Sequence, residues 1–154
     1  MLRARYAILA AALVFGYAYF YQAGGWNQNS RFDLVRSLAL HGTTRIDRYH
    51  QNTGDKARAF GHRYSDKAPG QALAAVPAVF AGAMVLRIVG VSPESDQGVV
   101  ALSYVATLVT AAIPTALAAL ALLWVCIRLG ASAGGASFAA LVFGIGTPMW
   151  AYAT

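Results

Sequence analysis

The chain has 154 residues, of which 58% are hydrophobic and only 12% are charged, and its formal net charge is +6. This balance excludes an ordinary soluble domain. The apolar residues fall in runs close to the length of about 20 residues that a helix needs to cross a bilayer. The single cysteine, Cys126, stands in an apolar stretch, so disulfides, cysteine-based zinc sites and a thiol nucleophile lack support. We therefore expect an all-α membrane protein.

Four apolar runs predict about four transmembrane helices, at residues 6–23, 69–89, 98–127 and 136–154. Arg3 and Arg5 precede the first run and tyrosines gather at its end, which is typical of an anchored helix rather than a cleaved signal peptide. The third run is too long for one upright crossing and too short for two, so we expect a tilted helix with a kink near Pro114. Because the last run ends without a polar flank, we expect the chain to be the N-terminal part of a longer polytopic domain.

Polar residues are concentrated in the first loop, residues 24–68. This loop holds eight of the twelve Lys and Arg residues and four aspartates, and so carries four of the six net positive charges. A basic surface beside a bilayer attracts anions such as lipid headgroups or a lipid-linked phosphate. Since the loop contains no nucleic-acid-binding motif, we expect membrane lipid and no nucleic acid among its partners.

Within the loop, "SRFDLVRSLALHG" at residues 30–42 predicts a short amphipathic helix on the membrane surface. Ser30 is a suitable N-cap, and Gly42 can terminate the helix. Asp33 stands at capping-box spacing from Ser30, so two interpretations of it stay open: a capping residue or a catalytic carboxylate. The segment that follows, up to the second apolar run, has no sustained period and predicts irregular structure.

The loop ends in "YSDKAPG", residues 64–70, directly before the second apolar run. The order of a first span, a polar loop with a surface helix and acidic residues, and then this corner resembles the N-terminal part of the GT-C class of integral-membrane glycosyltransferases. That class includes protein O-mannosyltransferases and aminoarabinose transferases, whose corner reads Tyr, two variable residues, Lys, Pro, Pro. Tyr64, Lys67 and Pro69 match this corner, whereas Ala68 stands in place of the first proline.

The resemblance implies a transferase that takes a sugar from a polyprenyl-phosphate donor on the external face of the membrane, which we expect to be the bacterial inner membrane, without a cofactor. It also implies that Lys67 lies near the donor phosphate, where a cation stabilises the charge on the departing group. We place Arg63, Tyr64 and Asp55 with it as substrate-binding residues. A lysine beside a tyrosine is also a common anchor at the edge of a span, and this alternative for Lys67 stays open.

In the family, a carboxylate of the first external loop acts as general base on the acceptor hydroxyl. The usual acidic pair is missing here, since Gln28 and Asn29 stand in its place. The catalytic carboxylate must then be Asp33, Asp47 or Asp55. We favour Asp47, because the arginines on either side of it would keep it ionised. The alternative is that Asp47 forms a solvated ion pair with one of those arginines.

Metal binding receives little support from the sequence. His41, His50 and His62 are irregularly spaced, and no two of them make a ligand pair on one helix face, so we expect no histidine metal site. Some relatives in the wider class use a divalent metal held by acidic residues, which leaves a metal at Asp33 or Asp47 open.

The orientation of the loop and the class of function each have an alternative. Short loops rich in Lys and Arg are usually cytoplasmic, whereas the resemblance places residues 24–68 outside. We follow the resemblance, because the cations can serve to bind an anionic substrate. The alternative function is a non-enzymatic polytopic membrane protein whose basic loop binds anionic lipid, or a fragment of a transporter.

Overall fold

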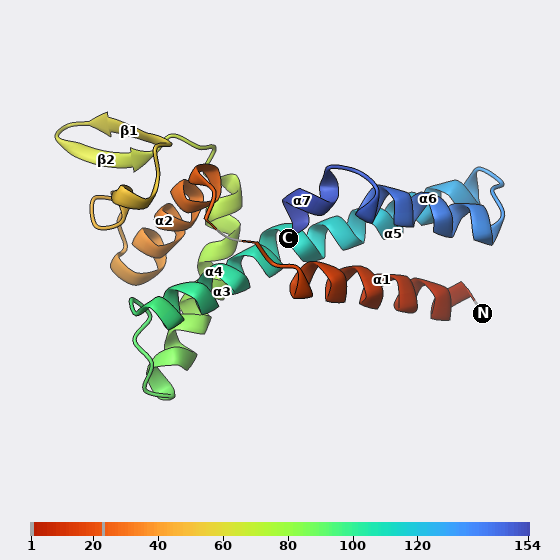
Figure 1. Cartoon of the computed structure of the whole chain (residues 1–154), viewed down its shortest axis with the longest axis horizontal. Coiled ribbons are helices and arrows are strands. Elements are labelled where there is room, and N and C mark those ends of the chain that lie inside the picture. The colour runs from red at the N-terminus through yellow and green to blue at the C-terminus, as the bar shows by residue number, and fades with distance from the viewer. Residues whose placement is uncertain (1, 23) are drawn as a thin grey trace. The chain divides into compact units, whose positions relative to one another are not determined.

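The computed structural model describes residues 2–22 and 24–154. The chain forms two compact units, one from residues 1–21 and 107–154 and one from residues 22–106, and each is described by itself (Figure 1). The structure is mostly helical, which confirms the helical class. It also contains one β-hairpin in the second unit, so the all-α prediction is wrong in this detail.

The first unit is a helical assembly packed through small residues. Its elements are α1 (Leu2–Tyr19), the π-helical segment η2 (Leu108–Ala112), α5 (Ile113–Arg128), α6 (Ala133–Ile145) and α7 (Met149–Ala153). The Tyr17 hydroxyl donates a hydrogen bond to the carbonyl oxygen of Gly144 at 3.0 Å. A Cβ on Gly144 would lie only 2.8 Å from a Leu13 methyl group, so α1 and α6 approach closely because this residue is glycine.

Two of the predicted spans differ from the helices that form. The first, predicted at residues 6–23, ends at Tyr19, and its last residue, Ala23, lies outside the described residues, as do the side chains of Arg3 and Arg5. The fourth, predicted at residues 136–154, is wrong, because α6 ends at Ile145 and only the short α7 follows. Gly146 caps α6, and Pro148, which has no backbone N–H, stands at the N-cap of α7, so the helix is interrupted between Ile145 and Met149.

The third predicted span corresponds to helical backbone from Asp96 to Arg128, 33 residues long. A π-helical segment, Leu108–Ala112, ends two residues before Pro114, which agrees with the irregularity expected there. Among residues 2–22 and 24–154, this helix and α3 (Gly70–Ile88) are the two whose length and composition suffice to cross a membrane. The apolar parts of α1 and α6 are shorter, so four transmembrane helices are not confirmed.

The second unit contains the polar loop. Its elements are α2 (Trp26–His41), the 3-10 turn η1 (His50–Asn52), β1 (Lys56–Ala59), β2 (His62–Ser65), α3 and α4 (Asp96–Thr107). The two strands pair antiparallel with Ala59 opposite His62, and the connecting Phe60 and Gly61 both have positive φ, of 50° and 80°. A two-residue connection of this kind matches the twist of a hairpin. The prediction of irregular structure after α2 is therefore wrong for these residues.

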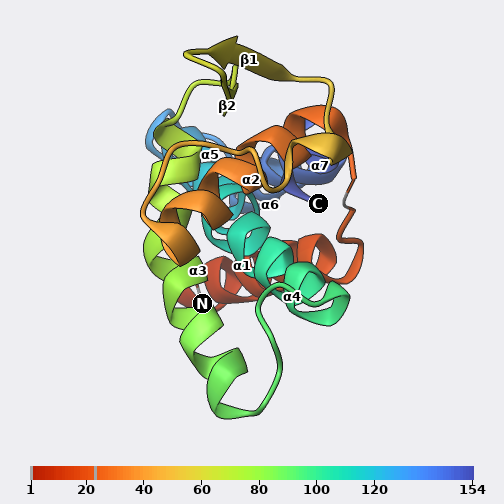
Figure 2. The same cartoon turned by 90° about the vertical axis from the view of Figure 1, so that its left-hand side faces the viewer.

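The helix predicted within the loop forms, but it starts earlier than expected. α2 begins at Trp26, and Ser30 lies buried inside it, with its hydroxyl 2.8 Å from that of Ser65, so Ser30 is not the N-cap. Gly42 ends the helix in the left-handed region at φ 64°, as predicted. α2 lies against α3 in both views, with the hairpin toward the N-terminal end of α3 (Figures 1 and 2).

Candidate functional site

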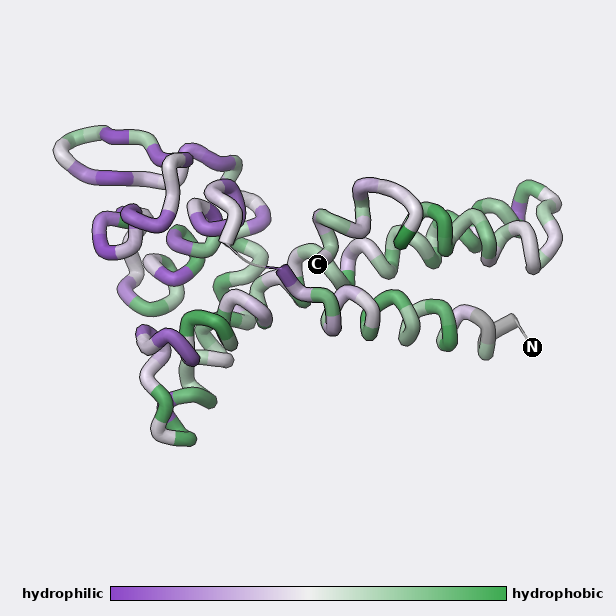
Figure 3. Tube along the Cα trace, viewed as in Figure 1, coloured by the Kyte–Doolittle hydropathy of each residue, from purple (hydrophilic) through white to green (hydrophobic). Residues whose placement is uncertain are grey.

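The hydrophilic residues of the second unit are concentrated in α2, the hairpin and the segments that join them, whereas α3 is largely apolar (Figure 3). Leu34 and Val35 of α2 pack with Ala75 and Val79 of α3 in one apolar core. This contact fixes α2 on the apolar helix, and the rest of the polar loop folds onto α2. The candidate site residues are therefore held by a structured layer rather than by a free loop.

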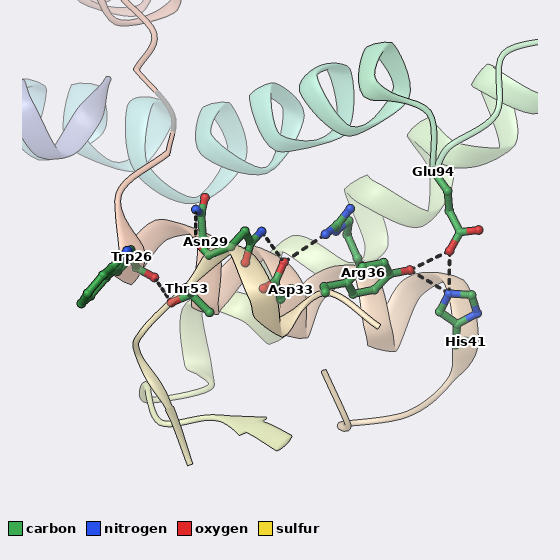
Figure 4. Close-up of polar contacts among 9 residues, drawn as sticks. Trp26, Asn29, Asp33, Arg36, His41, Thr53 and Glu94 are labelled. Atoms are coloured by element: carbon green, nitrogen blue, oxygen red, sulfur yellow. Dashed lines mark hydrogen bonds and ion pairs between the residues drawn. The ribbon is translucent and has the colours of Figure 1, made fainter. Parts of the chain in front are cut away.

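Asp33 and Arg36 form a buried ion pair on α2 (Figure 4). Asp33 is fully buried, and its Oδ1 accepts hydrogen bonds from Arg36 Nη2 at 3.0 Å and from Asn52 Nδ2 at 3.2 Å. Among the described residues, Asp33 Oδ2 and Arg36 Nε have no hydrogen-bond partner. Burial raises the pKa of Asp33, against the opposing effect of the hydrogen bonds from Arg36 and Asn52. The capping interpretation of Asp33 is wrong, because the residue lies two turns inside α2.

The Arg36 guanidinium lies over two aromatic rings. Its central carbon lies 3.7 Å from the centroid of the Tyr49 ring and 5.3 Å from that of Phe32. Stacking of this kind stabilises a desolvated cation. The Tyr49 hydroxyl in turn donates to Glu94 Oε1 at 2.8 Å, and burial and this bond raise the pKa of Tyr49 to about 12. Asp33, Arg36, Tyr49 and Glu94 thus form one connected series.

Asp47 lies outside this series and supports the hairpin. Its Oδ1 accepts the backbone N–H of Arg63 at 2.7 Å, and its Oδ2 lies 2.8 Å from His62 Nδ1. These contacts, the Arg63 N–H first and His62 second, lower the pKa of Asp47. Asp47 is therefore ionised, as expected. Its close partners, however, are residues of β2 and not the arginines that flank it in the sequence. A carboxylate with a depressed pKa and both oxygens engaged is a weak proton acceptor.

Lys67 lies between two carboxylates just before α3. Its Nζ is 3.0 Å from Asp55 Oδ2 and 3.3 Å from Asp66 Oδ1, and the Asp55 contact is the main cause of its raised pKa. We name these three residues the lysine cluster. Its formal charge is −1, because one ammonium group faces two carboxylates. The structure thus brings Asp55 and Lys67 together, two of the residues that the sequence assigned to substrate binding.

The chain on either side of the lysine cluster is tied to α2. The Asp55 N–H donates to Thr53 Oγ1 at 3.0 Å, and Thr53 donates to the carbonyl oxygen of Trp26 at 2.8 Å (Figure 4). On the other side, the Lys67 N–H donates to Ser65 Oγ at 3.3 Å, and that hydroxyl meets Ser30 of α2. These bonds position both partners of the Asp55–Lys67 contact without using their side chains.

The two other predicted substrate-binding residues lie on β2. Tyr64 pairs with Ala57 across the hairpin, and Arg63 pairs with Arg58. The backbone N–H of Arg63 donates to the Asp47 carboxylate, and its carbonyl oxygen accepts the Ile46 N–H at 2.9 Å. Since neighbouring residues of a strand point to opposite faces, the side chains of Arg63 and Tyr64 cannot face the same ligand from one side of the hairpin.

A divalent metal does not fit these residues. Asp33 is already paired with a guanidinium, which would repel a second cation, and Asp47 binds a backbone N–H and His62. In residues 2–22 and 24–154, no three His, Cys, Asp or Glu side chains are grouped as a metal ion requires.

Sequence reasoning did not identify Tyr49, Asn52 or Glu94 as members of the site. Tyr49 and Glu94 are 45 positions apart, and Asn52 lies 19 positions from Asp33. The available signal was Glu94 itself, an acidic residue in a short connection between two apolar runs.

No family model, curated protein or solved structure matches the chain.

Proposed function

We propose that the chain is the N-terminal part of a membrane glycosyltransferase that takes a sugar from a polyprenyl-phosphate donor, with the lysine cluster as the place where the donor phosphate and the acceptor meet. The observation that carries the proposal is the contact of Lys67 with Asp55 and Asp66 immediately before the apolar helix α3. A cation next to an apolar helix that contacts the bilayer can bind the phosphate of a lipid whose chain lies in the hydrocarbon. The resemblance of "YSDKAPG" to the GT-C corner supports the same assignment.

The roles follow from the charges of the lysine cluster. A phosphate that approaches Lys67 meets two carboxylates already bound there, so it must displace at least one of them. Displacement of Asp55 would leave a carboxylate next to the sugar-phosphate bond, where it can accept a proton from the acceptor hydroxyl. Lys67 would meanwhile stabilise the negative charge on the departing polyprenyl phosphate. Donor binding would thus release the base that the transfer requires.

Asp55 is preferred to Asp47 and Asp33 in this role. Asp47 holds the hairpin with both carboxylate oxygens, and Asp33 is fully buried against Arg36. Asp55 is half-buried and lies next to the proposed phosphate site. Asp47→Asn should therefore loosen the hairpin and leave transfer largely intact, whereas Asp55→Asn should lower transfer by about a hundredfold, as the loss of a general base does.

The experiment compares binding of undecaprenyl phosphate and of undecaprenol, which lacks the phosphate, to the chain in nanodiscs. Lys67→Ala should weaken binding of the phosphate by about tenfold and leave undecaprenol unchanged. Asp55→Asn should strengthen phosphate binding, since it removes a competing anion. Arg58→Ala, which deletes an exposed cation of β1, is the matched control and should have little effect.

Two results would contradict the proposal. Equal weakening by Lys67→Ala and Arg58→Ala would mean that the loop attracts anions through its overall charge, which is the non-enzymatic alternative. A phosphate affinity that is unchanged in Lys67→Ala would remove the donor site from the lysine cluster. Release of polyprenyl phosphate from a polyprenyl-phosphate-linked hexose, by membranes that contain the complete protein, then tests the Asp55 role separately from donor binding.

A further inference from the structure

The connection between α3 and α4 returns to the polar loop. Glu94, in this connection, accepts a hydrogen bond from the Tyr49 hydroxyl at 2.8 Å and lies 3.1 Å from His41 Nε2 (Figure 4). It also lies 3.9 Å from Arg48 Nη1. All three partners belong to the loop that precedes α3. In Figure 2 the chain turns back along α3 after the helix ends. Polar residues from both ends of α3 therefore meet in one cluster, which we name the Glu94 cluster.

This meeting conflicts with α3 as a membrane-crossing helix. α3 has 19 residues and so rises about 27 Å, close to the thickness of the hydrocarbon core. If it crossed the bilayer, Gly70 and Ile88 would lie at opposite surfaces. Glu94 follows Ile88 by six residues, a reach of about 20 Å at full extension. It could then approach His41 and Tyr49 only if charged residues entered the hydrocarbon.

The exposure of the Glu94 cluster excludes that arrangement. The side chains of Glu94, Arg48 and His41 are 47%, 69% and 25% exposed. Ionised groups that are not covered by protein are strongly disfavoured in the hydrocarbon core, where lipid offers no hydrogen bonds. The Glu94 cluster must therefore lie in water or among the headgroups, on the same side of the membrane as the rest of the polar loop.

α3 nevertheless has an apolar face with no cover from the second unit. One side of the helix is buried in the core through Ala72, Ala75, Val79 and Ala83. The opposite side carries exposed apolar residues at helical spacing, namely Leu73, Phe80, Met84, Val85 and Ile88. A continuous apolar stripe on the surface, next to a loop with four net positive charges, matches the interface of an anionic bilayer.

We infer that α3 does not cross the membrane but lies in its interface, with the Leu73–Ile88 stripe in the lipid and the segments at both of its ends on one side. The burial of this stripe anchors the second unit on the bilayer, and the Glu94 cluster holds the α3–α4 connection against the polar loop. The occupant of the exposed face is thus the acyl and headgroup boundary of the bilayer rather than another protein.

The first test measures sidedness by cysteine labelling in a Cys126→Ser background. Gln51→Cys reports the loop before α3 and Gln97→Cys reports the start of α4; both glutamines are exposed. With an impermeant thiol reagent, both positions should react in intact cells, or both should react only after lysis. Reaction of one position in intact cells and of the other only after lysis would overturn the inference.

The second test measures depth and does not depend on labelling efficiency. Spin labels at Leu73→Cys, Phe80→Cys and Ile88→Cys, in the same background, report the immersion of the beginning, middle and end of α3. An interfacial helix should place all three labels at similar depths, within about 5 Å. A Phe80 label that lies about 10 Å or more deeper than both others would show a crossing helix and would overturn the inference.

Discussion

Removal of Arg36 should be among the most destabilising single changes in the second unit. Asp33 is fully buried, and Arg36 is its cationic partner at 3.0 Å, with Asn52 as a neutral second donor. Arg36→Ala leaves a buried carboxylate without its counter-ion, a change that costs about 3 to 5 kcal/mol in free energy of unfolding. The loss of stacking on Tyr49 adds to this cost. Denaturant unfolding in mixed micelles at pH 7 measures the difference.

A double-mutant cycle separates the buried charge from lost packing. Asp33→Asn in the Arg36→Ala background removes the carboxylate that has lost its partner, so the double variant should regain about 2 kcal/mol or more. Arg31→Ala is the matched control, because Arg31 lies on the same helix but is only partly buried, and its hydrogen bonds to Asn27 and Gln71 are exposed. It should cost less than about 1 kcal/mol.

The pH dependence of the stability difference between Arg36→Ala and the unaltered chain tests the same reasoning independently. The pKa of Asp33 is raised in the folded chain, so its contribution to stability is most favourable at low pH and is lost as the pH rises through the folded pKa. Without Arg36 this shift should grow. The difference between Arg36→Ala and the unaltered chain should therefore shrink as the pH falls from 7 toward 4. A difference below about 1 kcal/mol at pH 7, or one that does not change with pH, would refute the reasoning.

Two further predictions concern the connection between α3 and α4. In Gly98→Ala the new Cβ would overlap the Ser92 carbonyl oxygen and lie 2.9 Å from Pro93 Cα. The change should therefore lower the free energy of unfolding by about 1 to 3 kcal/mol, measured by thermal or denaturant unfolding. Gly134→Ala is the control: it lies near the start of α6 with no described atom within 4 Å, so it should be neutral or stabilising. The pKa of Glu94 is lowered, first by the Tyr49 hydroxyl, so its stabilisation is present above the usual carboxyl pKa and is lost as the pH falls through the lower folded value. Protection of the α3–α4 connection against amide exchange, relative to the intrinsic rate at each pH, should decrease below about pH 4. An equally steep loss of protection in Glu94→Gln would assign the transition to another group.

Local features of the sequence determined most of the helices. The run predicted at 69–89 forms α3, and the run predicted at 98–127 lies within the helical backbone from Asp96 to Arg128. Gly42 ends α2 because glycine adopts the left-handed conformation at little cost. Each of these signals lies within the segment that it describes, so it can be recognised without knowledge of the remaining chain.

The hairpin and the burial of Asp33 were decided by tertiary structure. β1 and β2 have four residues each: KARA alternates charged residues with alanine, which is a poor strand former, and HRYS has no alternating apolar pattern, so the strand signal was too weak to recognise. Asp33 resembled a capping residue because its spacing from Ser30 fits a capping box, but α2 extends to Trp26 and the contact with Ser65 draws Ser30 inside. Packing on α3 then turns Asp33 into a buried charge.

The composition of the candidate site was likewise decided by long-range contacts. Sequence reasoning selected Lys67 and Asp55, but not their direct pairing, and it did not find the series from Asp33 through Tyr49 to Glu94. Hydrophobic periodicity and glycine positions report the conformation of a segment from within that segment. A hydrogen bond between residues 45 positions apart depends on how α2 and α3 pack, and that packing is a property of the folded unit rather than of either helix sequence.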